Sequence, residues 1–462
     1  MLRYGAAPPG LLPRLLVPAL LVVASPPAQA QVRPLPPDPS MGILLGAGIF
    51  TPSVTSSFSF SDNLFRVNDT EFVSVDQNGD GTTDSLARRT TTSSLVTEIS
   101  PRLSYLLPYS NSRLNVSYAA QYRNYSRVTL PAKIAHDLGL QNQLVLSNGM
   151  TFDLTGDYLR GFAESEEVDP AEQRAFSTTP FHNRRVSLGW RWMHPGHWGS
   201  VVTLDHAASR FLQTQQVFAG PAPVPFFDYR RSGFFLDGTW LGSSELEFYG
   251  GVGLHTTDQD RQQYNDYLVE NDEQSLGADL DGDGTLEAVN RSDLDPRDRL
   301  KERAFRMGVR GVLAQRYSGT AEFGYTEIHS ALGLDSGFRG MQMRLIVQAF
   351  LSSSSRLAVE MSRQPQQALV DQSETLVSNI VRVAWTLAPG SVHTWTAGFR
   401  FLGSDYGTSH DTNWVIDGSW AVRFHRRSQL QVGLQRVMHG SDIPSGEYNE
   451  DRVSLNWSFG WF

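Results

Sequence analysis

Asp451-Arg-Val-Ser-Leu-Asn-Trp-Ser-Phe-Gly-Trp-Phe462, the last stretch of the chain, decides the fold class. Within it every second residue is apolar, at Val453, Leu455, Trp457, Phe459 and Trp461. Because successive residues of a β-strand point to opposite faces, the stretch predicts a strand with one apolar and one polar face. Two tryptophans and a phenylalanine on one face suit lipid better than water, so this strand is typical of a membrane-spanning barrel.

The same two-residue alternation recurs in the interior of the chain. It is clearest in residues 114–123, 185–192, 245–254 and 414–425. In these stretches the charged residues fall on the polar face, where water inside a closed barrel would solvate them. A soluble β-sandwich or a β-propeller would also alternate, but it would not need so many strands of roughly 11–14 residues. A propeller would also repeat a motif every ~40–50 residues, and we find no such repeat.

Two kinds of connection separate the predicted strands. Eight are tight turns, at residues 107–112, 147–150, 193–199, 241–244, 315–319, 352–355, 387–391 and 425–428. Nine are longer and polar, at about residues 65–90, 127–132, 164–180, 213–227, 258–300, 332–337, 364–374, 404–412 and 440–448. Short periplasmic turns and longer extracellular loops are typical of outer-membrane barrels. The sequence therefore predicts an all-β, transmembrane, antiparallel up-and-down β-barrel of about 18 strands in the bacterial outer membrane, with both termini in the periplasm.

The N-terminus has the features of a secretory signal peptide. Arg3 and Arg14 are its only charges, residues 15–24 form a short apolar core, and Ala28-Gln29-Ala30 is a cleavage site. The apolar core is too short for a membrane-spanning helix, and no later stretch approaches the ~20 apolar residues that one needs. The expected organisation is a signal peptide (1–30), a Pro-rich periplasmic lead (31–48) and an outer-membrane β-barrel (49–462).

The composition excludes several classes of site and partner. The chain has no cysteine, so it has no disulfide, no thiolate metal site, no cysteine nucleophile and no lipidated cysteine. Its net charge is −9, and removal of the two signal-peptide arginines would make it −11. Such a charge disfavours nucleic acid as a partner.

Two segments carry a resemblance to a known family. FSFSDNLFRVND, residues 58–69, resembles the first-strand motif of the outer-membrane beta-barrel porin 2 family, in which Asp-Asn-Leu/Ile-Phe closes the opening strand. Residues 99–126 look like the next hairpin of that family. The resemblance implies an association with exopolysaccharide synthesis and export, so polysaccharide-export components are expected partners.

The membrane itself supplies further expected partners, namely outer-membrane lipid and lipopolysaccharide. The barrel-assembly machinery is expected to bind the C-terminal strand, because many barrels similar to this family end in a Phe in phase with the apolar face. Here Phe462 is out of phase and Trp461 is in phase. Either Trp461 takes this role or the last residue is a short overhang.

Two acidic segments have the spacing of a calcium loop. Each places oxygen-bearing side chains at alternate positions around a glycine at the sixth position, as Ca²⁺ loops require. The candidate ligands are Asp76, Asn78, Asp80, Thr82 and Asp84 in the first segment, and Asp279, Asp281, Asp283, Thr285 and Glu287 in the second. Ala87 and Asn290 replace the bidentate Glu of the full loop, and Asp, Asn and Gly are also ordinary turn residues. We expect weak Ca²⁺ binding, at about 10⁻⁴–10⁻³ M, in two extracellular loops.

Charged residues on the polar faces form the second candidate site. The predicted lumen-lining residues are Arg123, Arg185, Arg191, Asp205, Asp237, Glu245, Glu247, Arg310, Glu322, Arg344, Glu360, Arg382, Arg400, Asp417 and Arg423. In a porin such side chains tune which solutes pass. The alternative is that they pair across neighbouring strands and only hold the wall together.

Two functions follow from this reading. The first is a porin-like channel for passive passage of small solutes or export of polysaccharide. The second is a plugged structural or adhesive barrel that presents calcium-stiffened loops, with the loop at 258–300 long enough to fill the lumen. An enzyme is not expected, because neighbours such as His329-Ser330 or Ser409-His410-Asp411 point to opposite faces of a strand and form no relay.

Tryptophans near the predicted strand ends are expected to form aromatic belts at the membrane surface. They are Trp190, Trp192, Trp198, Trp240, Trp385, Trp395, Trp414 and Trp420.

Overall fold

The computed structural model describes the strands of the chain and most of its tight turns. The described residues are 42–63, 72–75, 85–88, 91, 93–126, 133–146, 149–162, 180–194, 197–211, 228–243, 245–260, 277–278, 287–288, 297–330, 338–367, 375–405, 410–442 and 447–460. Among them, no helix is long and apolar enough to cross a membrane. The predicted signal peptide and most of the predicted lead, residues 1–41, lie outside the described residues.

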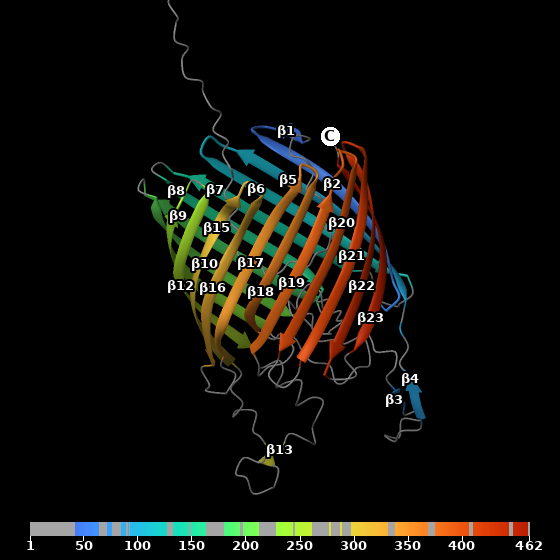
Figure 1. Ribbon diagram of the computed structural model, residues 1–462. Coiled ribbons are helices and arrows are strands. Elements are labelled where there is room, and N and C mark those ends of the chain that lie inside the picture. The colour runs from blue at the N-terminus through green and yellow to red at the C-terminus, as the bar shows by residue number, and fades with distance from the viewer. Residues whose placement is uncertain are drawn as a thin grey trace, which may run out of the picture.

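Eighteen long antiparallel strands close into a barrel (Figure 1). Each strand of the barrel pairs with the next along the chain, and the last strand, β23, returns to pair with the first, β2. The sheet contains a nineteenth strand, the short β1, which pairs only with β2 at one rim. The predicted fold and strand number are confirmed.

The strand bounds show that each barrel strand is 13 to 18 residues long. The barrel strands are β2 (Gly48–Ser61), β5 (Ser94–Pro108), β6 (Ser112–Tyr125), β7 (Lys133–Val145), β8 (Met150–Phe162), β9 (Pro180–Met193), β10 (Trp198–Phe211), β11 (Asp228–Leu241), β12 (Leu246–Asp260), β15 (Arg297–Ala314), β16 (Tyr317–Ser330), β17 (Phe338–Ser352), β18 (Ser355–Gln367), β19 (Thr375–Leu387), β20 (His393–Asp405), β21 (His410–His425), β22 (Ser428–Ser441) and β23 (Tyr448–Gly460). The short strands are β1 (Ile43–Leu45), β3 (Phe72–Val75), β4 (Ser85–Arg88), β13 (Gly277–Ala278) and β14 (Glu287–Ala288). β3 pairs with β4 and β13 with β14, so each pair forms a small two-stranded sheet separate from the barrel sheet.

The connections alternate between the two rims in the predicted way. The eight tight turns join β5 to β6, β7 to β8, β9 to β10, β11 to β12, β15 to β16, β17 to β18, β19 to β20 and β21 to β22. β2 begins at this rim and β23 ends there, so the first and last barrel strands both meet the periplasmic side. At Gly149 the turn needs glycine, because its φ is 74° and a Cβ would lie 2.5 Å from the Met193 carbonyl oxygen.

The outer face of the barrel is apolar and exposed. On β23, for example, Val453, Leu455 and Trp457 are 41–47% exposed in the isolated chain. Equivalent exposed residues on other strands include Leu204, Leu236, Val252, Phe323 and Leu434. A soluble monomer does not present such a continuous apolar surface. The closed ring with this outer face is an outer-membrane β-barrel, and the protein resides in the bacterial outer membrane.

Tryptophans gather toward the turn-side rim of this outer face. Trp198 and Trp240 are register partners on β10 and β11. Trp395 and Trp420 stack with ring centroids 5.7 Å apart. The indole nitrogen of Trp385 donates to Ser355 Oγ at 2.9 Å. Trp414 differs, because it lies in the loop-side half of β21 and packs against Phe401.

Candidate functional site

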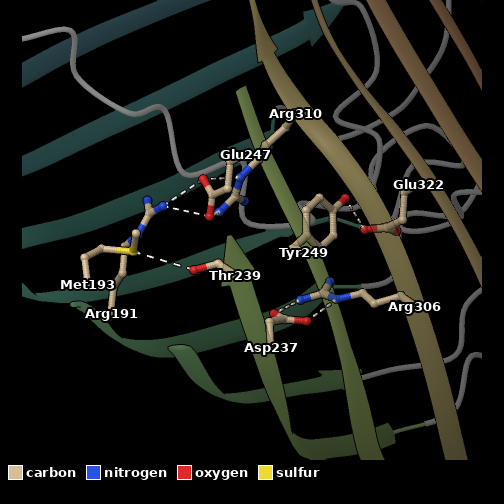
Figure 2. A network of polar contacts seen from close by, with 9 residues as sticks. All are labelled: Arg191, Met193, Asp237, Thr239, Glu247, Tyr249, Arg306, Arg310 and Glu322. Atoms are coloured by element: carbon tan, nitrogen blue, oxygen red, sulfur yellow. Dashed lines mark hydrogen bonds and ion pairs between the residues drawn. The ribbon is translucent and has the colours of Figure 1, made fainter. Parts of the chain in front are cut away.

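The inner wall of the barrel carries a network of charged side chains that spans five strands (Figure 2). At one level, Arg191 on β9 and Arg310 on β15 both contact Glu247 on β12. The Arg191 Nη2 donates to both Glu247 oxygens at 2.8 Å, and Arg310 donates through Nε at 3.1 Å and Nη2 at 3.0 Å. The Glu247 side chain is 11% exposed. One carboxylate therefore holds two cations from opposite sides.

A second ion pair lies toward the loop side of the first. Asp237 on β11 accepts two hydrogen bonds from Arg306 on β15, from Nε at 3.0 Å and from Nη2 at 2.6 Å. The same guanidinium lies 4.2 Å from the ring centroid of Phe235. A planar guanidinium matches both a carboxylate fork and an aromatic face, so Arg306 is held from two directions.

Tyr249 on β12 adds a neutral donor to the network. Its hydroxyl donates to Glu322 Oε2 on β16 at 2.8 Å. The Arg310 guanidinium lies 5.2 Å from the centre of the Tyr249 ring. Tyr249 therefore links Glu322, through its hydroxyl, with Arg310, through its ring (Figure 2).

Three contacts of this wall skip a strand that carries an inward-facing glycine at the crossing point. The Asp237–Arg306 pair crosses β12 at Gly251, the register partner of both residues. The Tyr249–Glu322 bond crosses β15 at Gly308. His255 on β12 reaches Asp205 on β10 at 3.1 Å by crossing β11 at Gly233.

A side chain at these glycines would occupy the space that the crossing residues use. A Cβ on Gly308 would lie 2.7 Å from the Tyr249 ring. A Cβ on Gly251 would overlap Oδ1 of Asp237, and one on Gly233 would overlap the His255 ring. The long inward side chains therefore lie along the wall over glycine, instead of projecting toward the axis of the barrel. We call this arrangement the glycine-backed wall; it comprises Gly233, Gly251 and Gly308 with the residues that cross them.

The opposite part of the wall is lined by small neutral groups. On β2 and β23, inward positions hold hydroxyl and amide side chains, namely Ser53, Thr55, Ser57, Ser59, Ser454, Asn456 and Ser458. On these two strands charge returns only toward the loop side, where Arg452 contacts Glu450 at 2.8 Å. The neighbouring β5 carries charge again, at Arg102 and Glu98, which are the register partners of Ser53 and Ser57. The lumen therefore has a charged wall on β9–β16 and a hydroxyl-rich wall on β23 and β2.

The predicted lumen residues fall into three groups. Some lie in ion pairs or hydrogen bonds, namely Arg123 (with Glu98), Arg191, Asp205, Asp237, Glu247, Arg310, Glu322, and the trio Arg344, Glu360 and Arg382. Arg185, Arg400, Asp417 and Arg423 share the inward register of their strands. Glu245 lies in the turn that precedes β12, at the rim.

Several residues of the network were not among the predicted ones. Arg306, Glu302, Arg231, Tyr249, His255 and Glu98 also face inward, and Arg231 contacts Glu302 at 2.9 Å. The sequence does contain a signal for them, because residues an even number of positions apart on one strand face the same side. Arg306 has the same phase as Arg310 on one strand, and Tyr249 has the same phase as Glu247 on another. Applying the alternation to every residue of every strand, and to uncharged polar side chains such as Tyr249 as well as charged ones, would have found them.

The candidate calcium ligands Asp76–Asp84 and Asp279–Thr285 lie outside the described residues, and Glu287 begins β14. The short strands on either side of each acidic segment pair with each other, β3 with β4 and β13 with β14. In the part of the chain that the structure describes, no group of three or more His, Cys, Asp or Glu side chains is arranged to hold a metal ion.

The histidines considered for catalysis are placed as follows. His329 Nε2 contacts Glu327 at 3.0 Å on the outer face of β16, where Glu327 also binds Arg339. His410 begins β21, and its backbone N–H donates to Asp442. Ser409 lies outside the described residues.

Comparisons with known proteins give barrels of the same general kind. No family model and no curated protein matches the chain. Among solved structures, the chain is similar to the ferric enterobactin receptor PfeA from Pseudomonas aeruginosa, with a TM-score of 0.45, 9% identity, and coverage of 89% of this chain and 81% of that one.

Two further similar structures are the copper transporter OprC and the FrpB iron transporter from Neisseria meningitidis. OprC has a TM-score of 0.43 and 10% identity, covering 89% of this chain and 81% of that one. FrpB has a TM-score of 0.41 and 8% identity, covering 92% and 82%. At these values the likeness says nothing about substrate, and the strand pairing itself establishes the architecture.

Proposed function

We propose that this outer-membrane barrel is a water-filled channel that passes small hydrophilic solutes passively. The observation that carries the proposal is the glycine-backed wall, because it keeps the long side chains of Arg306, Tyr249 and His255 flat against the barrel. A barrel of 16–18 strands is wide enough for an aqueous lumen when its inward side chains do not fill it. Polar and charged groups line this lumen, so water wets it.

The charges of the wall support weak rather than strong ion selectivity. Acidic and basic side chains face each other at short range, as in the pair Asp237 and Arg306. Paired charges of opposite sign largely cancel beyond a Debye length of about 8 Å at physiological ionic strength. Neutral solutes and both signs of small ion therefore pass at comparable rates.

A second candidate function is an exit channel for a neutral polysaccharide. The hydroxyl-rich wall of β2 and β23 favours it, because serine and threonine hydroxyls and amides donate to and accept from sugar hydroxyls. The resemblance of residues 58–69 to the porin 2 family also supports it. This candidate is a special case of the first, with a polymer as the solute.

Single-channel recording on the refolded full chain in planar bilayers tests the proposal. A steady conductance in KCl is the expected result, and silent but correctly folded barrels would overturn the channel in favour of a plugged adhesive barrel. Adding a linear neutral oligosaccharide then separates the two solutes. Transient blocking by the sugar, without blocking by polyethylene glycol of the same hydrodynamic size, supports the polysaccharide candidate; equal effects remove it.

A further inference from the structure

The outer surface of the barrel carries a cluster of cations on its loop side. We call this cluster the basic arc and define it as Arg160, Arg184, Arg210, Arg230, Lys301 and Arg303, on strands β8 to β11 and β15. Each of these side chains is exposed. Each also has the phase of the lipid-facing residues on its own strand, such as Val186 and Trp190 on the strand of Arg184. The basic arc thus lies on the membrane side of the wall, not in the lumen.

The strand register brings the members of the basic arc together. Arg160 and Arg210 are the partners of His182 from its two neighbouring strands. Arg184 and Arg230 are the partners of Ala208 in the same way, so they lie two strand spacings apart, roughly 10 Å. Lys301 and Arg303 follow on β15, opposite Thr256 and Leu254 of β12.

Most of the basic arc is not neutralised by the protein itself. Among the described residues, Arg160, Arg184, Arg230, Lys301 and Arg303 make no ion pair, and Arg210 lies 3.9 Å from Asp228. Two further acids at this level, Asp258 and Glu327, are engaged by Arg299 at 2.6 Å and Arg339 at 2.7 Å. The chain as a whole has a net charge of −9, so a one-sided surplus of cations runs against its composition. A surplus of this kind indicates an anionic partner.

The height of the basic arc identifies where that partner lies. Along β11, Arg230 is ten residues from Trp240, which lies near the turn-side rim. At 3.4 Å per residue and a tilt of about 40°, this separation is roughly 26 Å along the membrane normal. The lipid-facing apolar band of such barrels is about 25 Å tall. The basic arc therefore lies at the outer edge of the band, level with the headgroups of the outer leaflet.

Other polar groups mark the same level on neighbouring strands. The Tyr158 hydroxyl and His182 Nδ1 are 2.7 Å apart, and the Tyr118 hydroxyl and His136 Nδ1 are 2.8 Å apart, all on the outer face. Aromatic side chains with a polar end are typical of the membrane interface. On other strands of the outer face, Arg436 lies 3.6 Å from Asp451 and is therefore compensated, and Arg363 donates to Asn379 Oδ1 at 3.0 Å. The cations without an acidic partner are therefore concentrated on β8 to β15.

We propose that the basic arc is a binding site for the phosphate groups of lipopolysaccharide in the outer leaflet. Guanidinium groups bind phosphate oxygens through paired hydrogen bonds, and several side chains around one phosphorylated sugar headgroup supply more than one such contact. The acyl chains of the same molecule then pack on the apolar residues directly below, among them Val186, Leu204 and Phe234. The barrel therefore binds lipopolysaccharide more tightly on the side of the basic arc than on its other side.

The test compares two variants of the full chain with equal loss of charge. The first replaces four members of the basic arc, as Arg160→Gln, Arg184→Gln, Arg230→Gln and Arg303→Gln. The matched control replaces four exposed arginines elsewhere, as Arg316→Gln, Arg426→Gln, Arg427→Gln and Arg436→Gln. Retained lipopolysaccharide per barrel is measured by native mass spectrometry after detergent washing, on protein whose fold is checked by its heat-modifiable migration.

We expect the first variant to retain lipopolysaccharide about tenfold less than the wild type, and the control to stay within about twofold. Phosphatase-treated lipopolysaccharide is expected to bind the wild type as weakly as it binds the variant. Equal retention in the two variants, or equal binding of phosphatidylglycerol and lipopolysaccharide by the wild type, would overturn the proposal. If the fourfold variant does not fold, Arg184→Gln with Arg230→Gln replaces it, and unchanged retention there has the same consequence.

Discussion

Asp237 and Arg306 form a two-point ion pair across a strand that carries neither of them, at 3.0 and 2.6 Å. The strand between them, β12, has Gly251 at the crossing point. The pair therefore ties three strands together while its atoms stay close to the wall. The same relationship recurs for Tyr249 and Glu322 over Gly308. Wall stability and an open lumen thus depend on the same glycines.

Replacing Gly251 with alanine tests this dependence. A Cβ there overlaps Oδ1 of Asp237 and the carbonyl oxygen of Leu236, so Gly251→Ala is expected to lower the free energy of unfolding by about 1–3 kcal/mol. The neighbouring Gly250 faces lipid, and a Cβ there has only ordinary contacts, 3.6 Å or more away. Gly250→Ala is the matched control. Urea unfolding in detergent, followed by tryptophan fluorescence, measures both, and equal stability of the two variants would contradict the glycine-backed wall.

Replacing Glu247 with glutamine tests the charge balance of the channel. Glu247→Gln leaves Arg191 and Arg310 facing each other without a carboxylate. We expect the chloride-to-potassium permeability ratio to rise roughly two- to fivefold, because a unit charge a few ångströms from an ion in water contributes up to about 1 kcal/mol. The measurement is the reversal potential of single channels in a KCl gradient.

Two further variants complete that experiment. The double variant Glu247→Gln with Arg310→Gln removes one charge of each sign and is expected to return the permeability ratio toward the wild-type value. Glu245→Gln removes an acid from the turn before β12 and is expected to leave the ratio almost unchanged. A shift as large for Glu245→Gln as for Glu247→Gln would mean that net charge, and not the position of Glu247, controls selectivity.

Neighbouring residues on β10 test which face meets lipid. Leu204 is 48% exposed on the outer face at mid-height, and Thr203 faces the lumen. Leu204→Arg is expected to destabilise the folded barrel by about 2–4 kcal/mol, the cost of a cation at the bilayer midplane. Thr203→Arg places the same charge in water and is expected to cost less than about 1 kcal/mol. Denaturant unfolding in lipid vesicles measures the difference, and the reverse order would exchange the two faces.

The architecture could be predicted from the sequence because two independent periods describe it. Alternation with period two assigns each residue to a face, and the alternation of tight turns with long loops counts the strands. Both periods are local, so they can be recognised in the sequence without knowing which strands pair. Residues 185–192 show the first period, and the turn predicted at 147–150 shows the second. Their agreement explains why 18 strands and both rims were predicted correctly.

The contacts within the lumen could not be predicted in the same way. From the sequence, charges on the polar faces are expected to pair only between neighbouring strands, and Glu98 and Arg123 are one such pair in the structure. Asp237 instead reaches over β12 to Arg306, which depends on the register of three strands and on a glycine that leaves room. The basic arc was not recognised either, because a cation such as Arg184 on an apolar phase looks like an interruption of the pattern. Its function is suggested only by the structure, which places it at the height of the outer-leaflet headgroups.

Calcium binding by the two acidic segments stays a prediction, and the structure sharpens its test. A different pair of short strands flanks each segment, β3 and β4 for the segment of Asp80 and β13 and β14 for the segment of Asp283. The two segments are therefore expected to bind independently, each with a dissociation constant of about 10⁻⁴–10⁻³ M. Isothermal titration of the chelator-treated wild type should therefore show two equivalents of Ca²⁺. Asp80→Ala and Asp283→Ala should each remove one, and the double variant both. A titration with Mg²⁺ is the control, because the smaller ion needs near-octahedral geometry and is expected to bind more weakly. Heats that neither substitution changes would show that these segments are ordinary polar turns.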